Sequence, residues 1–196
     1  MVTTDDTRSH RPQADEPLLV RLTRQLEAAR GLDDWDRPLR LAATALNSSA
    51  SRRAILQGRA IGHAVHPVLT DLPLGCWTAA SLVDLVTGPE GRRPAERLTG
   101  IGLLAAAPTV VTGLSEWGET SAGNRRVGFV HALANVVAFG LYTGSWAARR
   151  GGRHSLGVAL GVAGAGTAAA GGYLGSHLAL ARNVASRDPA FTEDPS

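Results

Sequence analysis

Three histidines stand near the ends of long apolar segments of this sequence, where a titratable side chain is unusual. They are His66, His131 and His177. An imidazole inside a bilayer is unfavourable unless a hydrogen bond or a bound ligand compensates its lost hydration. Imidazole nitrogen is also a good ligand for haem iron and for divalent metals. These three side chains are therefore the first candidates for a functional site.

Two of the histidines have the placement that axial ligation of a haem requires. His131 lies about four residues inside its apolar segment and His177 about four residues from the end of its own. At 1.5 Å per residue, both lie roughly 6 Å inside the same membrane boundary. Gly175 leaves room for a porphyrin beside His177, and Asn135 follows His131 by one helical turn. We therefore predict a haem b site formed by His131, His177, Gly175 and Asn135.

The same segment also carries an observation against this site. Small residues at helical spacing form a stripe that ends at Gly175, and at 100° per residue His177 points to the opposite side of that helix. In the alternative interpretation, the histidines hydrogen-bond to neighbouring helices and bind no cofactor.

A second candidate site is a divalent metal centre at the membrane edge. His63 and His66 are three residues apart, and Asp71 and Glu116 are expected on the same side of the membrane. Two imidazoles and a carboxylate form a ligand set that suits zinc or iron. The alternative is that His66, which precedes Pro67, caps the exposed N–H groups at the start of a helix.

Four apolar segments position these residues, and each is long enough to cross the roughly 30 Å hydrocarbon core of a bilayer. Gly88-Pro89, residues 121–124 and Gly151-Gly152 separate them. We expect an all-α protein, an integral membrane four-helix bundle with amphipathic N-terminal helices. An ion pair between Asp84 and Arg97 is expected where the first loop joins two spans. The predicted spans are 66–87, 96–117, 127–148 and 155–181.

The regions on either side of the spans are polar. Residues 1–50 are predicted to be a partly disordered extension with amphipathic helices near 17–30 and 37–46. These helices are expected either on the membrane surface or on loops of the protein itself. The four-span domain is predicted for residues 51–182, and a disordered tail for residues 183–196.

Composition excludes several classes of function. Cys76 is the only cysteine, so the chain by itself forms no disulfide and no cysteine-ligated iron–sulfur cluster. The arginines are scattered without interleaved aromatic residues, so nucleic acid is not an expected partner. The lipid bilayer is the expected partner. Because no nucleophile–base pair or carboxylate pair stands out, we do not expect catalytic turnover by this chain alone.

Four motifs occur in order along residues 54–181, namely GHAVHPVLTDLPLGCWTAASLVDL, TGLSEW, RRVGFVHALANVVAFGLYTGSWAARR and GGYLGSHLAL. Together they resemble a family of small bacterial membrane proteins of unknown function, some of whose members are fused to a C-terminal Rieske iron–sulfur domain. This chain lacks the paired Cys and His motifs of such a domain. The resemblance implies a multi-pass protein of the bacterial cell membrane. Its characteristic positions include His66, Asp71, Asp84, Trp117, His131, Asn135, Gly175 and His177.

The histidine placement and the resemblance together suggest a function. We expect a haem-binding or other electron-transfer component of the membrane, with an iron–sulfur or other redox protein as its partner. The alternative is a non-redox membrane subunit, or a small proton- or solute-handling protein, in which the histidines are structural.

Overall fold

The computed structural model describes residues 16–185 and 187–191, and the regular structure in this part of the chain is helical throughout. The predicted all-α fold is confirmed. The disorder predicted for residues 1–15, 186 and 192–196 lies outside the described residues. Within the predicted tail, the N–H of Asp188 donates to the carbonyl of Gly62 at 2.8 Å.

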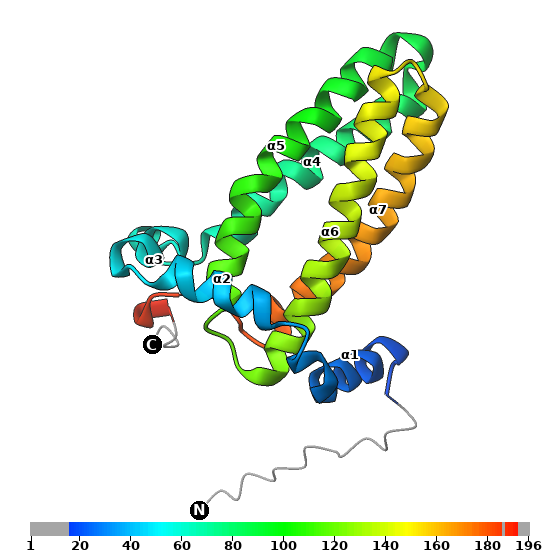
Figure 1. Cartoon of the computed structure of the whole chain (residues 1–196). Coiled ribbons are helices and arrows are strands. Elements are labelled where there is room, and N and C mark those ends of the chain that lie inside the picture. Colours follow the sequence, from blue (N-terminus) through cyan, green and yellow to red (C-terminus); the bar gives the residue numbers. More distant parts are fainter. Residues whose placement is uncertain (1–15, 186, 192–196) are drawn as a thin grey trace, which may run out of the picture.

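Four long helices form the body of the molecule, and three shorter helices precede them (Figure 1). Short 3₁₀ turns link several of them, and a π-helical turn, His177–Ala181, extends the last. The short helices are α1 (Leu18–Ala28), α2 (Arg37–Asn47) and α3 (Ala50–Leu56); the long helices are α4 (Val65–Val86), α5 (Arg92–Trp117), α6 (Ala122–Arg150) and α7 (His154–Ser176).

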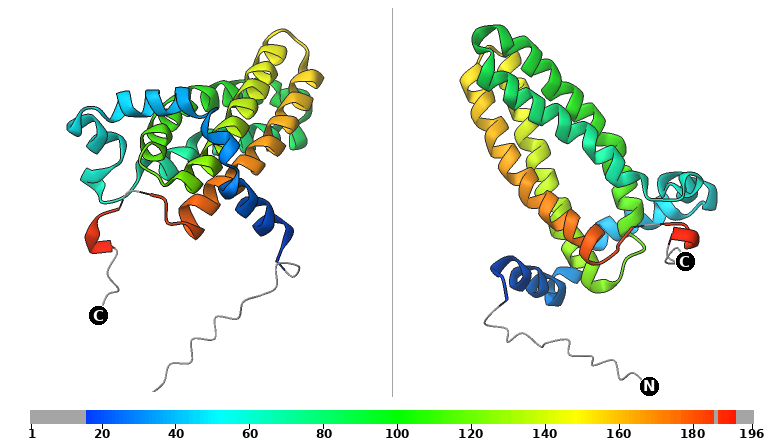
Figure 2. Two further views of the ribbon diagram at one scale, coloured as in Figure 1. Left: turned by 60° about the horizontal axis from the view of Figure 1, so that its bottom comes forward. Right: turned by 180° about the vertical axis from the view of Figure 1, so that it is seen from behind.

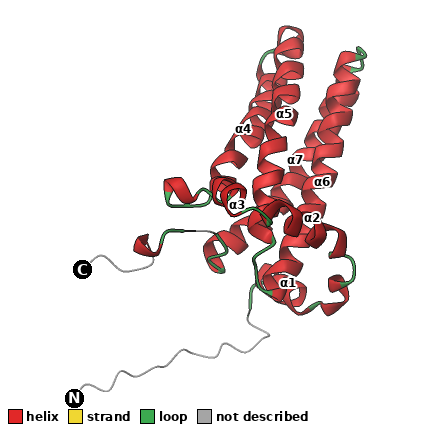
Figure 3. Cartoon of the chain, turned by 60° about the vertical axis from the view of Figure 1, so that its left-hand side comes forward, coloured by secondary structure: helices red, strands yellow, loops and turns green. Residues whose placement is uncertain are grey.

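The long helices are arranged as two antiparallel hairpins, α4–α5 and α6–α7, which lie side by side (Figure 2). Each hairpin turns at a glycine with positive φ, Gly88 at 57° and Gly152 at 74°, a conformation that glycine adopts without the strain of a side chain. Both turns lie at one end of the molecule. The three short helices gather at the other end (Figure 3).

Small residues line the contact within each hairpin. They let the two backbones approach closely, which is how helices associate in a bilayer. Large apolar side chains such as Leu85 and Leu104 remain outside and exposed, as lipid contact requires. The buried small residues include Ala95, Thr99, Gly102, Ala106 and Thr109 on α5, and Gly157, Gly161, Gly164, Ala168 and Gly171 on α7.

Three of the four long helices are long and apolar enough to cross a membrane. These are α5 with the turn before it, α6, and α7 with the turn after it. Helix α4 is not among these three, and its 22 residues include His66, Asp71, Asp84 and two prolines. That α4 is a fourth span stays a prediction, which its close packing along α5 favours.

Polar contacts hold the short helices against one end of the hairpins. Arg126 at the start of α6 donates two hydrogen bonds of 2.8 Å to Asp33, and Arg125 donates to the buried Asp36. Asn47 of α2 donates to the carbonyl of Ser115, whose hydroxyl donates back to it at 2.6 Å. The described part of the N-terminal extension is therefore packed on the bundle.

Candidate functional site

His131 of α6 is held by a backbone carbonyl of α7. Its Nδ1 lies 2.7 Å from the carbonyl oxygen of Gly171. A carbonyl can only accept, so Nδ1 carries the hydrogen and Nε2 presents its lone pair. The amide of Asn135 donates to that Nε2 at 3.0 Å. Gly175 makes this packing feasible, because a Cβ there would lie only 2.9 Å from Cε1 of the ring.

His66 of α4 is held in the same way by α5. Its Nδ1 donates to the carbonyl of Thr109 at 2.9 Å, and a Cβ on Gly113 would lie 2.6 Å from Cε1 of its ring. Among the described residues, Nε2 of His66 has no hydrogen-bond partner. His66 and His131 therefore lie on different hairpins, and each ring bonds to the other helix of its own hairpin.

These two histidines occupy equivalent positions of an internal repeat. His131 follows His66 by 65 positions, and the carbonyl and glycine that hold its ring, at 171 and 175, follow those at 109 and 113 by 62. The pattern H-x8-G-x-[WY]-T occurs at residues 66–78 and again at 131–143. The buried positions of α5 from 95 to 109 and of α7 from 157 to 171 also match one for one.

Two further pairs of equivalent residues meet where the hairpins face each other. The rings of Trp77 and Tyr142 stack with their centroids 4.0 Å apart and their planes at 12°. Beyond them, Arg149 donates two hydrogen bonds to Asp84, at 2.8 and 2.5 Å. Contacts between equivalent residues are what an approximate two-fold axis between two repeated hairpins produces.

His177 belongs to a different cluster. In the π-helical turn after α7, its Nε2 lies 2.9 Å from the carboxylate of Glu27 on α1. Arg182 donates two further hydrogen bonds to that carboxylate. Burial alone would raise the pKa of Glu27, but hydrogen bonds from Arg182 and His177 lower it below its usual value. In the described part of the chain no hydrogen bond or ion pair joins His177 to His131.

A comparison with known protein families identifies the helical body. Residues 62–188, which contain both hairpins, match the family model described as "Predicted membrane protein (DUF2231)". The chain belongs to this family. The resemblance to a family of membrane proteins of unknown function is therefore confirmed, and the DUF2231 match begins after helices α1 to α3. Searches of curated proteins and of solved structures gave no match.

The predicted metal ligands of the DUF2231 domain are not assembled into one site. Among the described residues, no group of three or more His, Cys, Asp and Glu side chains could hold a metal ion. His63 contacts the carbonyl of Ala64, His66 is turned toward α5, and Asp71 is exposed. Glu116 lies near the end of α5. The capping role considered for His66 is also absent, because its ring bonds to Thr109 of the neighbouring helix.

The predicted ion pair of Asp84 with Arg97 is wrong. Asp84 pairs with Arg149, and the two side chains are only 7% and 3% exposed. Arg149 also donates to the hydroxyl of Ser145, and His154 lies 3.6 Å from Asp84. Arg97 is exposed on α5. Arg97, although near in sequence, is therefore not the partner, because Asp84 faces the second hairpin.

Proposed function

We propose that this DUF2231 protein is a haem-binding electron-transfer component of the bacterial cell membrane, with His66 and His131 as its two nitrogen ligands. The observation that carries the proposal is that both histidine rings are held in the same way. Each sits on a different hairpin, and each ring donates Nδ1–H to a carbonyl of the adjacent helix. Nε2 is therefore the nitrogen that each ring could offer to iron, once Asn135 releases Nε2 of His131.

This arrangement suits an iron ligand for a known reason. Histidines that bind metals usually donate their other ring N–H to a carbonyl or carboxylate, which fixes the tautomer and makes Nε2 more basic. Helical bundles build such sites from side chains on facing helices. A bound haem would supply one-electron transfer between ferric and ferrous iron. Its partner would be another redox protein, such as an iron–sulfur protein.

The ligand pair proposed here differs from the pair that the sequence alone suggests. His177 is engaged by Glu27, whereas His66 occupies the position equivalent to His131. Asn135 must release Nε2 of His131 for iron to bind there. Asn135 keeps a partner after that release, since its amide also lies 3.0 Å from the carbonyl oxygen of His131.

One observation favours the non-redox alternative. With the Asn135 amide on Nε2 and Gly171 on Nδ1, both nitrogens of His131 are satisfied without any cofactor. A hydrogen-bonded histidine of this kind suits a structural subunit or a proton-handling membrane protein.

Absorption spectroscopy of the full-length protein separates the two functions. The protein would be purified in detergent from cells supplied with a haem precursor, and spectra recorded before and after reduction. We expect a sharp Soret band that shifts on reduction, lost or strongly altered in His66→Ala and His131→Ala but retained in His177→Ala. A colourless wild type that also takes up no haem in titration would contradict the proposal. A spectrum that survives His66→Ala but not His177→Ala would restore the His131 and His177 pair.

A further inference from the structure

Helix α1 carries an apolar stripe that the rest of the described chain leaves uncovered. Leu18, Leu19 and Leu22 are 60%, 53% and 46% exposed. The helix packs on the bundle through a different face, because Thr23 is buried with its hydroxyl 3.5 Å from that of Tyr173, and Glu27 pairs with His177. A leucine stripe normally covers a core, so this one requires another apolar environment.

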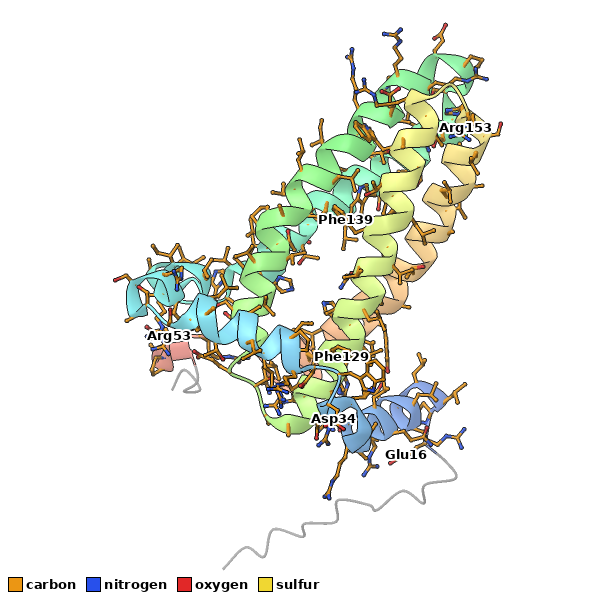
Figure 4. All side chains as sticks on the ribbon, in the orientation of Figure 1. Glu16, Asp34, Arg53, Phe129, Phe139 and Arg153 are labelled. Carbon is orange, nitrogen blue, oxygen red and sulfur yellow. The ribbon has the colours of Figure 1, made fainter. Side chains whose placement is uncertain are left out.

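The position of α1 indicates what that environment is. The helix packs against the start of α6 and the end of α7, the ends of two helices able to span a membrane. Its neighbour Tyr173 is 37% exposed, and Trp35 beyond α1 is 74% exposed. Aromatic residues with a polar tip gather at the headgroup level of a bilayer. In Figure 4, Glu16 and Asp34 mark the two sides of this region at the end of the hairpins.

The charges of α1 favour an anionic surface. Arg21 and Arg24 lie on the face away from the leucine stripe, and Arg30 follows the helix. The acidic residue of the helix itself, Glu27, is turned toward the bundle, where Arg182 and His177 compensate its charge. Glu16, just before the helix, pairs with Arg24. Guanidinium groups beside an apolar stripe are typical of helices that bind anionic phospholipid.

We propose that α1 is an in-plane anchor in a leaflet rich in anionic phospholipid. Leu18, Leu19 and Leu22 insert at the boundary of headgroups and acyl chains, and Arg21 and Arg24 bind the phosphates. This placement does not depend on whether the hairpins bind haem. It fixes the N-terminal helices at the same membrane boundary as the end of the hairpins that carries His66 and His131.

Spin labels on the two faces of α1 test this placement. The full-length protein with Cys76→Ala would carry either Leu22→Cys or, as the matched control, Ala28→Cys on the exposed arginine face, and be reconstituted in vesicles of phosphatidylcholine with phosphatidylglycerol. We expect the label at position 22 to be severalfold more accessible to oxygen than to a water-soluble nickel complex, and the label at position 28 to show the reverse. Vesicles of phosphatidylcholine alone, or Arg24→Gln, should reduce this contrast.

Three results would overturn the proposal. Equal access of the nickel complex to both labels would mean that α1 lies in water. Shielding of position 22 from both reagents would mean that protein covers the stripe. An unchanged contrast in neutral vesicles would exclude recognition of anionic lipid.

Discussion

The two ends of the interface between the hairpins use equivalent positions in different ways. Near the short helices the equivalent residues are identical, His66 and His131, whereas near the hairpin turns they are opposite in charge, Asp84 and Arg149. An aspartate and an arginine satisfy each other and close their end of the interface. The two imidazoles do not pair with each other, because each donates Nδ1–H to a carbonyl of its own hairpin. Nε2 of His131 accepts from Asn135, whereas Nε2 of His66 has no hydrogen-bond partner among the described residues. One repeated scaffold thus provides an ion pair at one end and places two imidazoles at the other.

The largest loss of stability should come from breaking the ion pair between Asp84 and Arg149. Asp84→Asn leaves the buried Arg149 without its counter-charge and should destabilise the protein by about 3–5 kcal/mol, as removal of one member of a buried pair does. Unfolding in detergent would measure the loss.

Two variants sharpen that result. Arg97→Gln is the matched control and should change stability by less than about 0.5 kcal/mol, because Arg97 is exposed. Exchanging the charges in Asp84→Arg with Arg149→Asp should recover much of the loss. If the two single losses simply add in the exchanged protein, the residues are not coupled.

The histidine end should be sensitive to an added methyl group. Gly113→Ala and Gly175→Ala place a Cβ 2.6 and 2.9 Å from the rings of His66 and His131, so each should destabilise the protein by about 1–3 kcal/mol through overpacking. Gly172→Ala is the control on α7, where a Cβ meets nothing within 4 Å. It should be neutral or stabilise the helix by up to about 1 kcal/mol. Equal behaviour of the three variants in detergent unfolding would refute the close packing of the rings.

A smaller effect should appear in the cluster around His177. The pKa of Glu27 is lower in the folded protein than its usual 4.5, so this contact stabilises α1 above pH 4.5 and is lost as pH falls through the folded value. We expect a contribution of about 0.5–1 kcal/mol, since the carboxylate is partly exposed. The protection factors of the α1 amides, which are exchange rates corrected for their intrinsic pH dependence, should fall on acidification in the wild type. In Glu27→Gln the protection should be low at every pH, and a wild type whose protection factors do not change with pH would contradict the contact.

Hydrophobic length and glycine-rich breaks were sufficient to predict the helical class and the approximate segments of the long helices. Closeness in sequence favours Arg97 as the partner of Asp84, whereas the actual partner is set by how the hairpins pack against each other. Matched depth and the nearby Gly175 favour His177 as the partner of His131. The depth of a residue does not determine the direction of its side chain. His177 lies in the final π-helical turn and points toward Glu27.

The repeated pattern H-x8-G-x-[WY]-T was present in the sequence and could have identified His66 as the counterpart of His131. It is short, and only four positions of α4 and α6 between 65 and 78 are identical to those 65 residues later. The contacts between Trp77 and Tyr142 and between Asp84 and Arg149 are what make the repeat recognisable.

Electron paramagnetic resonance of the haem-loaded ferric protein tests most directly whether His66 and His131 both bind the iron of one haem. We predict a low-spin signal typical of two imidazole ligands, converted to high spin or lost to the same extent by His66→Ala and by His131→Ala. A low-spin signal that persists in His66→Ala, or a wild-type protein that binds no haem, would contradict the account.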